Sequence, residues 1–225
     1  MARSSPISPK ATAACDVRIE ACLKTLENRS KGEVLEPKVH KPKRQRNQPH
    51  FDGRSLLFWV TGVDLTAIEG IEETTALIVL SEIGTDMSRW ASEKRFCSWL
   101  CLSPNHKMSG GKVYSRRTRP SANRAATALR LAANALHSSK SALGAQFRRL
   151  KGRLGAPKAI TAMAHKLARL IYALLKHGTA YVTQGMAEYE AKYHARLVKS
   201  LERRAKDLGF VLMPQTPPAV ETVPA

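Results

Sequence analysis

Residues 65–84 do most to decide the fold class, and they read LTAIEGIEETTALIVLSEIG. The run from Thr74 to Ile83 is apolar at helical spacing, and Gly84 follows it as a stop signal, so it predicts a helix. Gly70 stands between this helix and the apolar residues before it. The whole stretch is therefore typical of a helix-hairpin-helix, in which Ala76 and Leu80 face the first helix.

A glycine hairpin of this kind offers backbone N–H groups and a helix N-terminus to one DNA phosphate without reading bases. Gly70 is thus a candidate DNA contact. The usual second glycine of the motif is Glu72 here, and Glu69, Glu72 and Glu73 would repel a phosphate. The pattern predicts the hairpin fold more firmly than it predicts phosphate contact.

The chain around this motif is also helical in pattern. Apolar residues recur at spacings of three and four, and capping residues punctuate them. We see no internal repeat and no pattern of a sheet, so we expect a mainly α fold. The further helices that we expect are 93–101 after the Ser92 cap, 121–137 with Ser121 as cap, 142–154, a helix from Pro157 to His177 that stops at Gly178, and a last helix from Met186 to Leu208 that ends at Gly209.

The two ends differ from the body of the chain. We expect residues 1–13 and 214–225 to be disordered, 14–32 to hold a short helix, 33–50 to be an extended basic linker rich in proline, and 51–213 to form the globular domain. Cys15, Ile19, Cys22 and Leu26 share one face of the short helix. Because so short a helix cannot bury a face alone, we expect it to need a partner.

Charge indicates the partner of the globular domain. The 225 residues carry 37 Lys and Arg against 18 Asp and Glu, a net charge of +19. Residues 94–187 contain no Asp or Glu but eighteen Lys and Arg, yet they remain rich in Leu and Ala. A folded basic surface of this kind favours nucleic acid as the ligand.

The same composition excludes other classes. No apolar run approaches the roughly 20 residues of a membrane helix, and the first residues lack the apolar core of a secretory signal. Four cysteines without such a signal indicate free thiols in a reducing compartment, so we expect a cytoplasmic, nucleoid-associated protein. Cys97 and Cys101 lie one helical turn apart among apolar residues, where thiols pack, and with His106 they make a poor zinc set.

A basic loop from Asn105 to Pro120 carries the candidate chemistry, the sequence Ser109-Gly-Gly-Lys112. It is not a phosphate-binding Walker A loop, because His106 stands where that motif needs its first glycine. A serine beside two glycines is accessible to a large substrate, although a flexible turn has the same pattern. The cations that can surround a scissile phosphate near Ser109 are Lys112, Arg116, Arg117, Arg119 and Arg124, and the backbone of Gly110 and Gly111 lies beside it.

Several motifs in order resemble one known family. They are Phe96-x2-Trp99-Leu-x-Leu-Ser-Pro104, Ser109-Gly-Gly-Lys112, Asn123-Arg-Ala-Ala126, Ser141-Ala-Leu-Gly144 and Gly155-Ala-Pro-Lys-Ala-Ile-Thr-Ala162. Together they resemble the C-terminal serine domain of the bridge-RNA-guided DEDD insertion-sequence transposases, over about residues 15–213. The resemblance implies that Ser109 attacks a DNA phosphodiester and forms a covalent protein–DNA intermediate. It also implies a structured guide RNA that chooses donor and target DNA.

One departure from the family affects the expected activity. Family members carry an N-terminal RuvC-like domain that binds divalent metal through four carboxylates, the last two as Asp-x-x-Asp, and this sequence has no Asp-x-x-Asp. We therefore expect no metal site in the chain, Mg²⁺ only together with such a domain, and a truncated protein that is incomplete as an enzyme. The alternative is a non-catalytic nucleic-acid-binding protein, or an inhibitor that joins a full-length transposase through the helix at residues 15–26. We expect the protein partner to be a second copy of the chain or a full-length transposase.

Overall fold

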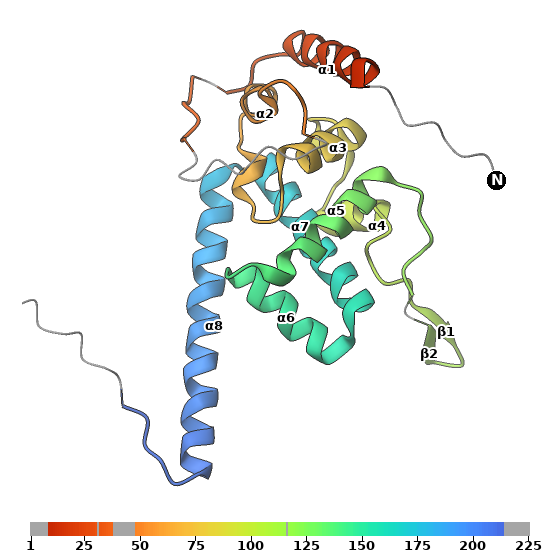
Figure 1. Ribbon diagram of the computed structural model, residues 1–225. Coiled ribbons are helices and arrows are strands. Elements are labelled where there is room, and N and C mark those ends of the chain that lie inside the picture. The colour runs from red at the N-terminus through yellow and green to blue at the C-terminus, as the bar shows by residue number, and fades with distance from the viewer. Residues whose placement is uncertain (1–8, 31, 38–47, 116, 214–225) are drawn as a thin grey trace, which may run out of the picture. The chain divides into compact units, whose positions relative to one another are not determined.

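A computed structural model describes residues 9–30, 32–37, 48–115 and 117–213. The chain divides into two compact units, unit 1 from Met1 to Val182 and unit 2 from Thr183 to Ala225. The described residues are mainly helical, which confirms the expected fold class (Figure 1). The elements in order are α1 Pro9–Lys24, α2 Gly53–Thr61, the 3₁₀ turn η1 Leu65–Ala67, α3 Glu73–Ile83, the 3₁₀ turn η2 Met87–Arg89, α4 Glu93–Trp99, β1 Lys107–Ser109, β2 Lys112–Ser115, α5 Arg124–Ala135, the 3₁₀ turn η3 Leu136–Ser138, α6 Ala142–Leu154, α7 Ala156–His177 and α8 Thr179–Asp207.

Two central helices, α5 and α7, organise the core of unit 1. They pack on each other, α3 packs on α5, and both α4 and α6 pack on α7. The buried face of α5 is mostly alanine, which lets the neighbouring backbones approach closely, while leucine and phenylalanine fill the spaces around it. The fully buried side chains include Ala125, Ala126, Leu129, Ala133, Phe96, Phe147, Met163 and Leu167.

Most helix ends follow the expected signals. Ser92 caps α4 by accepting a hydrogen bond from the Arg95 N–H, and Gly178 ends α7. The cap of α5 was expected at Ser121 but is Asn123, whose side chain accepts from the Ala126 N–H at 3.0 Å. Ser121 instead accepts a hydrogen bond from the Asn123 N–H, so it supports the capping residue rather than the helix.

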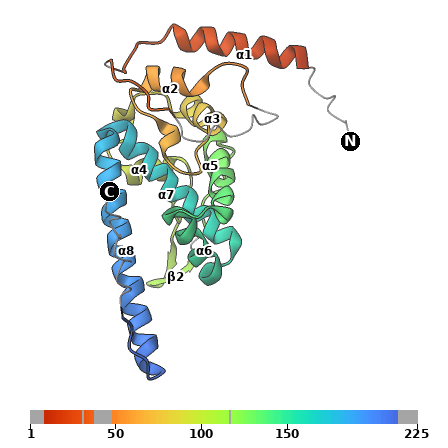
Figure 2. The same cartoon turned by 60° about the vertical axis from the view of Figure 1, so that its left-hand side comes forward.

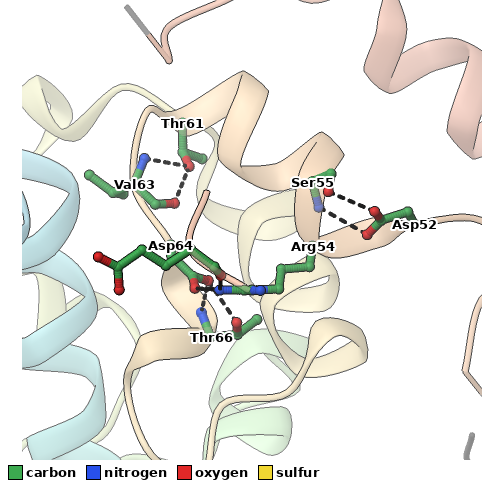
Figure 3. Close-up of polar contacts among 8 residues, drawn as sticks. Asp52, Arg54, Ser55, Thr61, Val63, Asp64 and Thr66 are labelled. Atoms are coloured by element: carbon green, nitrogen blue, oxygen red, sulfur yellow. Dashed lines mark hydrogen bonds and ion pairs between the residues drawn. The ribbon is translucent and has the colours of Figure 1, made fainter. Parts of the chain in front are cut away.

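The expected helix-hairpin-helix remains a prediction. The helix expected as its second arm is α3, but in place of a first helix the structure has the three-residue turn η1. Asp64 stops a longer helix from forming here, because its carboxylate holds the Thr66 N–H and hydroxyl and fixes a tight turn. Arg54 of α2 binds the same carboxylate at 2.6 Å, so α2 supports the motif from outside it (Figure 3).

The N-terminal helix begins earlier than expected. α1 starts at Pro9, so residues 9–13 are helical where we expected disorder, and it ends at Lys24, within the expected range 14–32. It packs against α2, and Asp16 accepts a hydrogen bond from the His50 N–H at 3.1 Å. The partner expected for this helix is therefore, at least for one face, α2 of the same chain. The disorder expected for residues 1–8 and 214–225, and most of the basic linker, lie outside the described residues.

Unit 2 holds most of α8, which begins at Thr179 rather than at the expected Met186 and ends at Asp207, just before the expected stop residue Gly209. The Phe210 N–H donates to the Ala205 carbonyl at 2.8 Å, and Gly209 has a φ of 81°, which is the usual helix-ending geometry. No helix in the described parts of either unit combines the length and the apolar character needed to cross a membrane.

Candidate nucleic-acid interface

The basic loop that we expected to be irregular contains a β-hairpin. β1 and β2 pair in antiparallel fashion, with Ser109 opposite Lys112 and Met108 opposite Val113. Gly110 and Gly111 form the two-residue turn, with φ of 53° and 75°. Positive φ at both positions defines a type I′ turn, which glycine adopts without strain. The expectation of no sheet is therefore wrong at this place.

The hairpin brings the serine and its neighbouring cation to an exposed tip. Ser109, Gly110, Gly111 and Lys112 are all exposed, and the register makes Ser109 and Lys112 direct cross-strand neighbours. Directly opposed residues in an antiparallel pair have Cβ atoms about 5 Å apart. The structure therefore gathers four of the predicted site residues in one turn.

The end of α4 positions the base of this hairpin. The Leu102 N–H donates to the Cys97 carbonyl at 3.0 Å, and Cys101 adopts a left-handed φ of 54°, so the helix ends in a Schellman motif without glycine. Leu102 is buried and fixes the chain just before it leaves the core. An isolated bridge between Pro104 and Thr118 then closes the base of the loop.

An aromatic cluster holds α4 itself on α7. The ring of Phe96 lies 5.0 Å from that of Trp90 and 5.6 Å from that of Tyr172, measured between centroids. The Tyr172 hydroxyl donates to the Trp90 carbonyl at 2.9 Å, and Glu93 pairs with Arg169 at 2.7 Å. The hairpin therefore starts from a rigid support, while its tip projects from the helical body of unit 1 (Figure 1).

Three of the predicted arginines, Arg117, Arg119 and Arg124, lie away from the tip. Arg117 is at the base of the hairpin, where its carbonyl accepts from the Asn105 N–H at 3.1 Å. Arg119 donates to the Ser98 hydroxyl at 3.3 Å, and Arg124 opens α5 and faces Glu82 at 3.6 Å. Both guanidinium groups remain largely exposed to solvent. Arg116 lies outside the described residues.

Gly70 has a structural reason to be glycine. Its φ is 85°, and a Cβ at this position would lie 3.0 Å from a methyl carbon of Leu136. The turn thus rests against the end of α5. Its neighbour Glu69 accepts a hydrogen bond from the hydroxyl of Ser139, between η3 and α6, which ties the same turn to the α5–α6 corner. DNA contact by Gly70 remains a prediction.

The titratable groups of α4 and α7 pack rather than form a metal or nucleophilic site. Burial raises the pKa of the Cys97 thiol to about 12, so this cysteine stays protonated, as its expected packing role requires. Burial, with Arg169 nearby, lowers the pKa of His165 and of Lys166. Among the described residues, no three His, Cys, Asp or Glu side chains come together as a metal site. The described residues do not fit the Mg²⁺ that the resemblance implies.

The structure adds cations that sequence reasoning did not single out. Lys151, Arg153 and Lys158 are exposed around the turn between α6 and α7. Both views show this turn at the same end of unit 1 as the hairpin (Figures 1 and 2). All three lie in residues 94–187, whose lack of Asp and Glu already indicated a nucleic-acid-binding surface. Which of the many cations in this range lie near Ser109 depends on how the helices pack, and the sequence alone does not show it.

One known family matches part of the chain. Residues 64–148 match the model of the transposase IS116/IS110/IS902 family. The match supports a transposase. It begins at Asp64 and ends within α6, so it contains Gly70, the whole Ser109 hairpin and Arg124. A search of curated proteins gives no match to the chain.

Proposed function

We propose that this chain acts in DNA transposition, binds element DNA at the hairpin, and uses Ser109 as the nucleophile of strand transfer. The observation that carries the proposal is the cross-strand pair of Ser109 and Lys112 at an exposed glycine turn within the transposase match. An exposed turn of this shape can approach the backbone of a large substrate, which a buried serine cannot.

The chemical step is a phosphoryl transfer onto serine. The Ser109 oxygen attacks phosphorus and forms a serine–phosphate ester, while the bond from phosphorus to one sugar oxygen breaks. The serine loses its proton and the departing sugar oxygen gains one. Lys112 stabilises the negative charge that builds on the non-bridging oxygens, because a fixed cation beside the reacting phosphate favours the transition state. No step of this proposal passes through a metal.

Cations beyond the tip bind the flanking phosphates. Lys107 and Arg117 lie along the hairpin, and Arg119 and Arg124 lie on the path from the hairpin into α5. Lys151, Arg153 and Lys158 extend the basic surface at the same end of the unit. These contacts position DNA without reading its sequence. In this proposal a structured guide RNA chooses the site, as the resemblance implies, and a second copy or a full-length transposase is the protein partner.

The experiment that tests the nucleophile is trapping of a covalent adduct. The purified chain is incubated with nicked suicide element-end DNA and the matching RNA, with and without a separately supplied RuvC-like domain and Mg²⁺. We expect a denaturant-resistant protein–DNA adduct that Ser109→Ala abolishes while the dissociation constant for DNA changes by less than about two-fold, because one neutral hydroxyl contributes little to phosphate binding.

Ser115→Ala is the matched control, since Ser115 lies on the other strand of the same hairpin, opposite Lys107. It should leave the adduct intact. An adduct that persists in Ser109→Ala, or a large loss of DNA affinity in that variant, would contradict the assignment of the nucleophile.

A second candidate function is non-catalytic binding of element DNA or RNA, including inhibition of a full-length transposase. It is favoured by the absence of any Asp or Glu from residues 94–187, which leaves Ser109 without a carboxylate base on its own hairpin. Salt-dependent binding is common to both candidates. Binding without an adduct under every condition above would favour this second function.

A further inference from the structure

The hairpin exposes two large apolar side chains in addition to its charges. Tyr114 is 68% exposed and Met108 is 62% exposed, on neighbouring strands of a small projection. No hydrogen bond, ion pair or ring contact joins Tyr114 to another residue that the structure describes. Apolar side chains gathered on a projection mark a binding surface more often than scattered ones do.

The surroundings of these side chains select the chemistry of the partner. Lys107 and Lys112 are exposed on the same two strands, Arg117 follows at the base, and no carboxylate pairs with them among the described residues. A cationic surface with an exposed aromatic ring matches a nucleic acid, which offers phosphates and flat bases together. A protein partner would have to supply a matching cluster of acids.

A β-bulge places the tyrosine beside the serine strand. The pairing shifts between Lys107 and Met108: Lys107 pairs with Ser115 and Met108 with Val113, so Tyr114 is the extra residue between these two pairs. Ser109 lies two residues beyond Lys107 on the same strand, a separation of about 7 Å at the usual rise of a strand. A base in contact with Tyr114 therefore lies within a nucleotide or two of a phosphate at Ser109.

Energies decide which form of DNA the ring can contact. Stacking of one base on an aromatic side chain tightens binding by about five-fold to a hundred-fold. Opening an intact base step costs a comparable free energy, which cancels that gain. A base that is already unpaired or unstacked carries no such cost. An exposed tyrosine therefore favours DNA with an unpaired base over fully paired duplex.

We propose that Tyr114 stacks on an unpaired base next to the phosphate held at Ser109, and that the preferred substrate is therefore DNA with an unpaired base at this site rather than continuous duplex. The inference rests on the proposed function in that the same hairpin binds DNA, but it does not require that Ser109 reacts.

The test compares two DNAs of the same sequence, one fully paired and one with 2-aminopurine at an unpaired position, using the full-length chain. Binding is measured by anisotropy, and stacking is measured by quenching of the 2-aminopurine fluorescence. We expect about ten-fold tighter binding of the unpaired DNA, with quenching. Tyr114→Ala should lose both the preference and the quenching, while Tyr114→Phe should keep them.

Leu131→Ala is the control, because Leu131 is 69% exposed but lies on α5. It should bind both DNAs as the unchanged protein does. Thermal melting of Tyr114→Ala should match that of the unchanged protein, since the side chain is not buried.

Two results would overturn the inference. One is a Tyr114→Ala variant that keeps its preference, or that weakens binding to both DNAs equally. The other is a variant with unchanged DNA binding that loses self-association in sedimentation, which would make this surface a protein contact. The two proposals can fail separately. If the unchanged chain forms no adduct but both it and Ser109→Ala prefer the unpaired DNA, the catalytic proposal is wrong and the stacking proposal is supported.

Discussion

The backbone of Gly70 shows how a single residue connects the expected DNA-binding turn with the core. Its left-handed φ of 85° is open to glycine, and its Cα faces Leu136 at the end of α5. Another amino acid must accept both a strained backbone and a contact of 3.0 Å. The residue that sequence analysis singled out for a phosphate is therefore also required for packing.

We expect Gly70→Ala to lower the free energy of unfolding by about 2 kcal/mol, because alanine in the left-handed region costs about 1–2 kcal/mol before any clash. Urea unfolding followed by circular dichroism measures the change. Gly152→Ala is the matched control. Gly152 lies within α6 with open space around it, so alanine there should raise the stability by up to about 1 kcal/mol. Equal effects at the two glycines would contradict the packing argument.

At the scale of elements, one ion pair fixes α2 to the turn that precedes α3. Asp64 is the cap of η1, and Arg54 reaches it from α2 with both Nε and Nη2 on the same oxygen, at 3.1 and 2.6 Å (Figure 3). Both side chains are mostly buried. Burial by itself would raise the pKa of Asp64, but hydrogen bonds from Arg54 and Thr66 outweigh it and lower this pKa.

Asp64→Asn should lower the free energy of unfolding at pH 7 by about 2–3 kcal/mol, because it leaves the buried Arg54 without its charge partner. A carboxylate with a lowered folded pKa stabilises the protein above its unfolded pKa of about 4 and loses this contribution as the pH falls through the folded value. The difference between the two proteins should therefore shrink below about pH 4.

Urea unfolding at several pH values measures this difference. Asp86→Asn is the control, since Asp86 caps η2 through Ser88 as Asp64 caps η1, without a hydrogen bond from an arginine. A loss in Asp86→Asn as large as in Asp64→Asn would mean that the cap, and not Arg54, carries the effect.

The helices could be predicted from the sequence because their signals are local. Ser92 before α4, Pro157 at the start of α7 and Gly178 at its end act within one turn of the chain, and the structure confirms them. The hairpin was missed because strands of three and four residues show no alternation, although Gly110-Gly111 is a known signal for a type I′ turn. The short first arm of the expected helix-hairpin-helix follows from Asp64 and its partner Arg54, and both residues lie outside the pattern in residues 65–84.

The candidate site also has a part that the sequence predicts and a part that depends on the fold. Ser109, the two glycines and Lys112 are contiguous in sequence, so their grouping was predictable from the motif. The pairing of Arg124 with Glu82, and the gathering of the α6–α7 cations at the hairpin end, depend on how helices pack. Contacts of that kind join residues far apart in the chain, and a single sequence does not reveal them.

At the scale of the whole molecule, charge is separated along the chain. Every Asp and Glu of unit 1 precedes Lys94, and from there to the end of the unit all charged residues are cations. Glu82 and Glu93 reach across to Arg124 and Arg169. Most cations of the second half therefore stay available for an external polyanion, whose binding releases condensed counterions and depends steeply on salt.

This separation predicts where the salt dependence of DNA binding arises. Combined replacement of Lys151, Arg153 and Lys158 by Gln should weaken binding of every DNA sequence. It should also reduce the magnitude of the slope of log K against log salt concentration by about 2–3. Each phosphate that the protein no longer neutralises reduces this magnitude by about 0.9. Replacement of Lys199, Arg203 and Lys206 in unit 2 removes the same charge from exposed positions of α8. Anisotropy titrations over a range of salt concentrations measure both slopes. Equal slopes for the two triple variants would mean that net charge alone drives binding, whereas a weakening confined to the first variant places the DNA across the α6–α7 turn and the Ser109 hairpin.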